Sequence, residues 1–246
     1  MNQQPVVVLI HGLFGFRKLL WLEYFNGVRS LYESMGLRVL TPGLPWAGTI
    51  EQRAQALALQ LKHEQGPLHL LAHSMGGLDG RYWITHMDGD HKVASLTTLS
   101  TPHRGSSVSE HINSGLSPLR LFPGARSLTR PALKSFNANT PDSPTVCYRS
   151  YSAYRPIAEQ VWSLRRFGKI IQQLEGNNDN LVSVHSAQWG DHINTLPCDH
   201  FELIFRDFWL NPFRKRNKFD PMPIYRDIGE WILQHQNSSK EKLVAP

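Results

Sequence analysis

The sequence predicts an α/β fold: a mostly parallel central sheet with helices on both faces and a small cap or lid insertion. Apolar runs of strand length alternate with helical patterns over residues 5–99. The predicted strands are apolar throughout rather than alternating, as expected for parallel strands buried on both faces. The chain has 246 residues, of which 41% are hydrophobic, and this is enough for one large core. We therefore expect residues 1–246 to form a single domain.

The first four predicted strands are short apolar runs bounded by turn residues, and two further strands are expected where regular patterning returns after the insertion. The first is a near-continuous β-branched run that ends at His11-Gly12, and the second ends at Pro42-Gly43. The predicted strands are residues 5–10, 37–40, 68–72, 93–99, 145–151 and 192–196.

The predicted helices show helical spacing of apolar residues and stop at glycine or proline. Residues 20–35 stop at Gly36, and residues 49–63 are followed by Gly66-Pro67. The predicted helices are residues 20–35, 49–63, 75–86 and 223–236, the last with Ile224, Ile228, Trp231 and Ile232 on one face. Residues 164–174 fit either a helix or a strand. The polar tail after Asn237 is expected to fray.

Regular patterning fails between residues 102 and 144. This stretch is rich in Ser, Pro, Gly, Asn and Arg and has weak periodicity. Long irregular stretches inside a compact domain are usually functional or mobile. We therefore expect an irregular cap or lid insertion at about 103–144.

A serine turn carries the main chemical signal. Ala72-His73-Ser74-Met75-Gly76-Gly77 closes an apolar strand and opens a helical pattern, the context of a nucleophile elbow. The sharp turn requires small residues two positions before and after the serine, and Ala72 and Gly76 satisfy this. The helix dipole behind the turn favours negative charge there. Ser74 is the candidate nucleophile, although such a turn could also simply cap a helix.

A second motif follows the first strand, at His11-Gly12-Leu13-Phe14-Gly15. In serine hydrolases the residue after the nucleophile and a loop after an earlier strand supply the oxyanion-hole N–H groups. These are Met75 and Leu13 here. His11 is expected to hold the loop rather than move protons. Phe14 and His73, beside these motifs, are expected to contact the substrate.

A serine nucleophile needs a base and an orienting carboxylate, which follow it in the order acid, then histidine. Asp179 lies in a turn-rich segment between apolar stretches, and His200 follows the last predicted strand. These are the candidate acid and base. We prefer them over His185, expected in a short helix, and His192, expected in or beside a strand. Asp199 is expected to point away from His200, as an exposed residue or a loop cap.

Taken together, these motifs resemble those of the bacterial triacylglycerol lipases of the Pseudomonas, Burkholderia and Proteus type, within the α/β-hydrolase superfamily. The motifs named above carry the resemblance together with Ser100-Thr101-Pro102-His103-Arg104-Gly105-Ser106 and Asn178-Asp179-Asn180-Leu181-Val182. It extends from about Val6 to His200. The resemblance implies ester hydrolysis through an acyl-enzyme, with Ser74, Asp179 and His200 as the triad and Leu13 and Met75 as the oxyanion hole.

Two departures from the family pattern matter. Many of these lipases bind a structural calcium ion between two aspartates, one upstream of the acid and one shortly after the histidine. Here Glu202 takes the second position, and residues 152–164 contain only Glu159 as an acidic residue. We therefore expect no calcium and no other cofactor. The segment between Ser74 and Asp179 is also shorter than in Burkholderia-type enzymes, which implies a smaller cap.

Charge and cysteine content narrow the possible partners. The net charge is +6, and basic residues of the insertion are interleaved with apolar ones. A second basic cluster spans residues 214–218 between Phe213 and Phe219. These two groups of basic residues are compatible with transient contact with anionic lipid and equally with an ordinary solvated surface. Nucleic-acid binding is not expected, since no recognition motif accompanies the charges.

The chain shows neither a signal-peptide pattern nor an apolar run long enough to span a membrane. We therefore expect a cytoplasmic protein, unless a leader has been removed. Its two cysteines, Cys147 and Cys198, are too few for a disulfide framework, although one bridge is possible.

The expected function is hydrolysis of carboxylic esters, acylglycerols or other fatty-acyl esters among them. Two alternatives remain open at this level. The same triad could serve an acyltransferase or a thioesterase, which product analysis with competing alcohols or an acyl-CoA assay would separate. A non-catalytic lipid-binding protein on the same fold would fail to react with a fluorophosphonate probe.

Overall fold

The computed structural model describes residues 4–15, 18–19, 22–115, 117–204 and 219–244. Its centre is a six-stranded sheet in the order β4-β1-β5-β6-β7-β8, and every neighbouring pair is parallel. The strands are β1 (Val6–Ile10), β4 (Arg38–Leu40), β5 (Leu68–His73), β6 (Val93–Leu99), β7 (Cys147–Ala153) and β8 (Asp191–Leu196). The predicted α/β class and its strands are confirmed.

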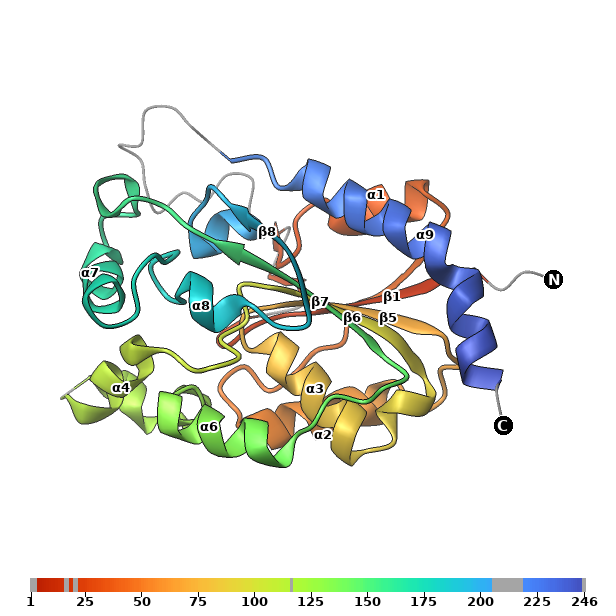
Figure 1. Cartoon of the computed structure of the whole chain (residues 1–246), viewed down its shortest axis with the longest axis horizontal. Coiled ribbons are helices and arrows are strands. Elements are labelled where there is room, and N and C mark those ends of the chain that lie inside the picture. Colours follow the sequence, from red (N-terminus) through yellow and green to blue (C-terminus); the bar gives the residue numbers. More distant parts are fainter. Residues whose placement is uncertain (1–3, 16–17, 20–21, 116, 205–218, 245–246) are drawn as a thin grey trace.

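Helices cover both faces of this sheet (Figure 1). One face carries α1 (Val28–Ser34) and α9 (Met222–Val244), and the other carries α2 (Ile50–Gln60) and α3 (Gly76–His86). Alternation along β1 builds both cores: Val7 and Leu9 pack with α1 and α9, whereas Val8 and Ile10 pack with α2 and α3. Side chains of successive strand residues point to opposite faces, and β1, which is buried on both, is apolar at every position.

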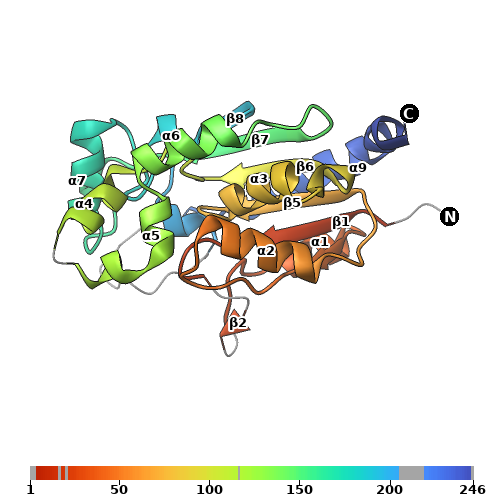
Figure 2. The same ribbon diagram turned by 90° about the horizontal axis from the view of Figure 1, so that it is seen from below.

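The carboxyl ends of the strands face the remaining helices (Figure 1). The insertion folds into α4 (Ser107–Ser114), the 3₁₀ turn η2 (Pro118–Leu121), α5 (Pro123–Ser127) and α6 (Arg130–Asn139). Figure 2 shows these helices gathered at one end of the molecule, near α7 (Arg165–Leu174). Of the two structures open for residues 164–174, the helix is therefore the one found. Short turns complete the chain: η1 (Gly89–His91), η3 (Ile157–Glu159), α8 (Val184–Ala187) and η4 (His200–Leu203).

The prediction of an irregular insertion was wrong. Its helices start at local signals that weak periodicity hides: the Ser106 side chain caps α4, and proline occupies the first turn of α5 and α6. Leu133 and Leu128 bury themselves against Met75 and Leu78, at the start of α3. The insertion is thus packed onto the helix that follows the serine turn.

The predicted helix over residues 20–35 was also wrong in its first half. A two-residue hairpin, β2 (Lys18–Leu19) with β3 (Leu22–Glu23), precedes α1. Gly27 separates them with a left-handed φ of 79°, which no right-handed helix can contain. At the other end of the chain, α9 continues to Val244 through the tail expected to fray.

Candidate active site

The serine turn has the backbone that a nucleophile elbow requires. Ser74 lies between β5 and α3 with a φ of 55°, a left-handed conformation that is costly for a residue with a side chain. Its N–H donates to the Leu99 carbonyl at 2.9 Å, and its carbonyl accepts the Thr101 hydroxyl at 2.7 Å. A Cβ on Gly76 would lie 2.6 Å from the Ile10 carbonyl oxygen. Two neighbouring strand ends therefore hold the turn in its strained shape.

The loop of residues 11–15 packs directly on this turn. A Cβ on Gly12 would lie 2.8 Å from the Ser74 Cβ, so only glycine allows the approach. Within the described part of the chain, the N–H groups of Leu13 and Met75 donate to no protein acceptor. Unpaired N–H groups beside a reactive oxygen are what an oxyanion hole provides.

His11, the first residue of this loop, has a buried side chain. Its Nε2 accepts the Leu44 N–H at 3.2 Å, and its Nδ1 lies 2.9 Å from the Gly12 carbonyl oxygen. Burial and then Arg53 lower the pKa of His11 to about 4. A neutral ring fixed at both nitrogens anchors the loop.

Asp179 and His200 come together across two loops. The His200 Nδ1 lies 2.7 Å from Asp179 Oδ2, and the His200 N–H donates to the Asp179 carbonyl at 3.0 Å. The other carboxylate oxygen, Oδ1, accepts the N–H groups of Leu181 and Val182 at 3.0 and 2.7 Å. This local turn fixes the carboxylate, as short acidic side chains commonly do. Both Asp179 and His200 are buried.

A chain of hydrogen bonds joins this pair to the serine turn. The Gly12 N–H donates to the Tyr24 hydroxyl at 3.0 Å, and that hydroxyl lies 2.8 Å from His73 Nδ1. The His73 Nε2 lies 3.0 Å from the His200 carbonyl oxygen. Burial lowers the pKa of His73 well below its ordinary value, so the neutral ring accepts from Tyr24 and donates to His200. The residue before Ser74 thus ties the 11–15 loop to His200.

The two expected substrate contacts lie in different surroundings. Phe14 is 36% exposed and packs its ring against Trp46 and Phe122, at centroid distances of 5.4 and 5.2 Å. His73 is fully buried with both ring nitrogens engaged. This placement favours a structural role for His73 over the substrate contact we expected.

The alternative histidines and Asp199 have other surroundings. His185 is in α8, and His192 is on β8, beside Ser150 and Ser152. Asp199 is a cap, as expected, but it is buried rather than exposed, and its Oδ2 accepts the Val161 N–H at 3.1 Å. The fold needs its carboxylate to join two loops.

Sequence reasoning missed Tyr24 and Arg53, both buried beside the candidate site. Arg53 Nε donates to Asp79 Oδ2 at 2.9 Å, and its Nη2 donates to the His11 carbonyl at 2.5 Å. No sequence motif marks either residue, and their roles appear only when distant segments meet. A buried arginine in a helix pattern is the one signal that could have found Arg53, because buried cations need partners.

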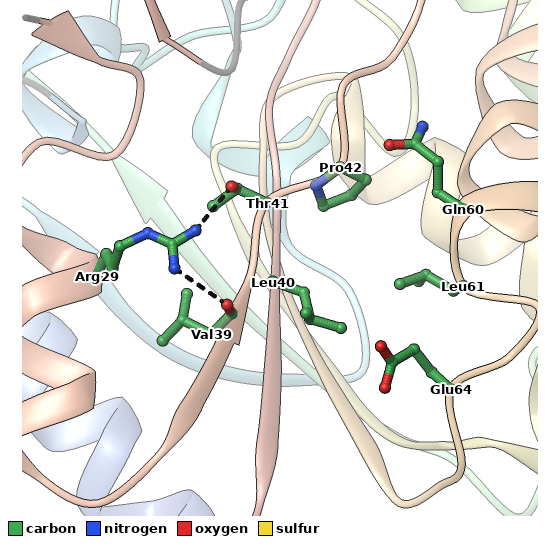
Figure 3. A pocket seen from close by; sticks show the side chains of 8 residues that line it. All are labelled: Arg29, Val39, Leu40, Thr41, Pro42, Gln60, Leu61 and Glu64. Atoms are coloured by element: carbon green, nitrogen blue, oxygen red, sulfur yellow. Dashed lines mark hydrogen bonds between the residues drawn. The ribbon is translucent and has the colours of Figure 1, made fainter.

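A cavity of about 290 Å³ lies at the edge strand β4 (Figure 3). Its polar side chains already bond within the protein: Arg29 donates to the Val39 carbonyl and the Thr41 hydroxyl, and Gln60 bonds both backbone groups of Gly43. It is lined by Arg29, Val39, Leu40, Thr41, Pro42, Gln60, Leu61 and Glu64. None of these is a candidate site residue.

The described residues include no group of three or more His, Cys, Asp or Glu side chains suited to hold a metal ion. They also include no helix that is both long and apolar enough to cross a membrane. The basic cluster at residues 214–218 lies outside the described part of the chain. Cys147 and Cys198 are not joined in a disulfide.

A left-handed serine turn between a parallel strand and a helix, beside a bonded aspartate–histidine pair, defines a serine hydrolase of the α/β-hydrolase fold. The structure of Staphylococcus hyicus lipase shares this fold, with a TM-score of 0.75 at 17% identity over 96% of this chain and 97% of that one.

Sequence comparison gives the family. Triacylglycerol lipase 2 of Saccharomyces cerevisiae is 36% identical over 87% of this chain and 74% of its own length. A triacylglycerol lipase of Pseudomonas fragi is 30% identical over 49% of this chain and 42% of its own length. No family model matches. The chain belongs to the triacylglycerol lipase family and is a carboxylic ester hydrolase.

Proposed function

We propose that this enzyme hydrolyses fatty-acyl esters, acylglycerols among them, with Ser74 as nucleophile, His200 as base and Asp179 as the orienting acid. The proposal rests on the 2.7 Å contact between His200 Nδ1 and Asp179 Oδ2. The His200 backbone is in turn hydrogen-bonded to His73, the residue before the left-handed Ser74. The names of the relatives support the choice of acylglycerols as substrates.

The steps follow from this arrangement. His200 Nε2 takes the Ser74 proton as the hydroxyl oxygen attacks the ester carbonyl, and Asp179 stabilises the imidazolium at Nδ1. The Leu13 and Met75 N–H groups receive the oxyanion. His200 then protonates the leaving alcohol, and a water molecule activated by His200 releases the fatty acid from Ser74.

Substitution of the triad tests this proposal. Ser74→Ala should lower the hydrolysis of p-nitrophenyl butyrate by at least about 10⁴-fold and abolish labelling by a fluorophosphonate. Asp179→Asn should lower kcat by about 10⁴-fold while the protein stays folded. Ser135→Ala, an exposed serine on α6, is the matched control and should keep full activity. A Ser74→Ala enzyme that still turns over would overturn the assignment.

We also propose that the enzyme docks transiently on lipid through an apolar patch formed by Phe14, Trp46, Leu121 and Phe122. Trp46 is 57% exposed and Leu121 is 69% exposed. The patch joins the insertion to the 11–15 loop, because Gly124 N–H donates to the Ala47 carbonyl and Phe14 N–H to the Trp46 carbonyl. Exposed apolar side chains grouped in this way commonly mark interaction surfaces.

Charge beside the patch favours an anionic surface. Arg120 and Arg126 are exposed next to it, whereas Arg130 is paired with Glu110 at 2.7 Å. Trp46→Ser with Leu121→Ser should weaken sedimentation with phosphatidylglycerol vesicles, and Arg120→Gln with Arg126→Gln should reduce its salt dependence. Equal binding to phosphatidylcholine vesicles at every salt concentration would count against the electrostatic part.

A further inference from the structure

Arg155 connects the two loops that carry Asp179 and His200. It lies just after β7 and is only 6% exposed. Its backbone N–H donates at 3.1 Å to the carbonyl of Asn178, the residue before Asp179. Its side chain reaches the other loop, where Nη2 and Nε donate to Glu202 Oε2 at 2.7 and 3.2 Å. One residue therefore contacts the loops on both sides of the Asp179–His200 contact.

Glu202 transmits this contact to the backbone of the histidine loop. The same Oε2 accepts the Asp199 N–H at 2.8 Å, and Asp199 precedes His200. Asp199 in turn accepts the Val161 N–H, which lies beyond η3 on the Arg155 side. The backbone on either side of His200 is thus held from the loop after β7.

The acid side is held as tightly. The Gln160 amide donates to the carbonyl of Arg155 at 3.0 Å and to Asn178 Oδ1 at 3.0 Å. That oxygen also accepts the Asn180 N–H at 2.9 Å. The residues before and after Asp179 are therefore bonded into the same network.

Charge explains why a cation is needed there. Three carboxylates lie on the two loops around this contact. Burial and then Glu202, Asp179 and Asp199 raise the pKa of the Cys198 thiol, while Arg155 lowers it. Asp179 and Asp199 are fully buried, and the Glu202 side chain is 13% exposed. Like charges collected in a low-dielectric region repel unless a cation lies among them.

A calcium ion does not fit these residues as they are arranged. The Glu202 oxygen that faces Arg155 already accepts three N–H groups, and Asp199 Oδ2 accepts another. A hard divalent cation would need those oxygens as ligands and would meet the guanidinium. Among the described residues, these oxygens therefore form no cage for the calcium ion that many lipases of the resembled family bind.

We propose that the Arg155–Glu202 ion pair is the positioning element that holds His200 against Asp179, and that ester hydrolysis consequently needs no divalent metal. The inference rests on the triad assignment proposed above. Arg155 acts through the two loops and contacts no reacting atom.

The test combines substitutions with metal removal. Arg155→Gln, Arg155→Lys, Glu202→Gln and the double Arg155→Gln/Glu202→Gln variant are assayed on a soluble p-nitrophenyl ester. Fluorophosphonate titration counts the reactive sites, so that kcat refers to folded enzyme only. Arg38→Gln, which breaks an exposed pair with Glu64 at the sheet edge, is the matched control and should keep the kcat of the parent enzyme.

Arg155→Gln should lower kcat by about ten- to hundredfold with little change in KM, as loss of a group that orients a site residue does. Arg155→Lys should retain more activity. The double variant should recover part of the loss, because the Glu202 carboxylate no longer lies there without its guanidinium partner. The acid limb of the kcat/KM profile should move to higher pH in Arg155→Gln. The charges then facing His200 would be Asp179, Asp199 and Glu202, beside the neutral His73. Prolonged EDTA treatment should leave the parent enzyme's kcat and Tm unchanged.

Two results would overturn the inference. One is an Arg155→Gln enzyme with unchanged kcat per titrated site and an unmoved acid limb, which would make the pair merely structural. The other is loss of activity in EDTA that Ca²⁺ restores. Failure of the proposed function is distinguishable, since it would appear as activity retained in Ser74→Ala.

Discussion

Arg53 joins the 11–15 loop to the helix that follows Ser74. Its guanidinium contacts Asp79 in the first turn of α3, the His11 carbonyl and the Pro45 carbonyl. Both charged side chains are fully buried. Burial raises the pKa of Asp79 to about 6, although Arg53 opposes the shift. The ion pair therefore sets the relative position of the candidate oxyanion donors more than it adds net stability, because desolvation offsets much of the attraction.

Removing only the cation should be costly. Arg53→Met should lower the free energy of unfolding by about 3–5 kcal/mol, because a buried carboxylate loses its partner. Arg53→Met with Asp79→Leu should recover much of that stability but not kcat, since the His11 carbonyl stays unbraced. Urea unfolding and ester hydrolysis measure the two effects separately. An equal loss of stability in the single and double variants would contradict this account.

At the scale of the residue, the sequence motifs correctly predicted local turns, such as those at Ser74 and Asp179. The serine turn, the 11–15 loop and the Asp179 turn each depend on contacts between near neighbours in the chain, so short motifs reveal them. The residues that connect these motifs were not predicted. Tyr24, Arg53 and Arg155 contact segments that lie far apart in the sequence. Their neighbours in the sequence do not indicate which partner each will contact.

At the scale of elements, buried strands and long helices were predictable because burial imposes a repeating pattern. Thr49 and Gln52 form the capping box that starts α2, a signal within one turn of helix. The insertion escaped prediction because α4 and α5 are short, and helices of that length depend on tertiary contacts. Glu175 supplies one: it accepts the Ser107 N–H at the start of α4 and the Ser183 hydroxyl, both at 2.7 Å.

That contact also ties the insertion to the segment that carries Asp179. The Ser106 hydroxyl donates to the Leu181 carbonyl at 2.7 Å, and the Arg104 N–H donates to the Ser186 hydroxyl at 3.1 Å. The start of the insertion is therefore fixed to the acid side of the site. The exposed apolar patch lies further along the insertion, next to the 11–15 loop.

Across the whole molecule, buried neutral histidines link stability to pH. Burial lowers the pKa of His11 and His69 to about 4 and holds those of His73 and His103 well below the ordinary value. Between pH 6.5 and 4 the unfolded chain binds these protons and the folded chain does not. Stability must therefore fall as pH falls through this range. Asp79 opposes this trend. Because its pKa is raised to about 6, the folded protein binds a proton below about pH 6 that the unfolded chain does not yet bind, and this proton stabilises the fold.

The net effect should be a steep loss of stability on the acid side. When folding lowers the pKa of a histidine from 6.5 to about 4, the free energy of unfolding falls by about 3 kcal/mol as the pH falls through this range. The unfolded chain gains the proton there, whereas the buried ring does not. Urea unfolding at pH values from 7.5 to 4.5 should show this decline. His69→Leu should reduce the slope of the free energy of unfolding against pH by up to the amount that corresponds to one bound proton. His63→Leu, at an exposed site, is the control. A pH-independent free energy of unfolding would contradict the account.

By itself the sequence determined the parallel sheet, the helices on its two faces and the sharp turn at Ser74 between a strand and a helix. Each follows from periodicity or a motif within a few neighbouring residues. The tertiary structure decided the rest: the hairpin before α1, the helices of the insertion, the burial of His73 and the Arg155–Glu202 pair between the loops that carry Asp179 and His200. These depend on which distant segments share a buried, low-dielectric space, and polar groups there are stable only with partners that the fold brings to them.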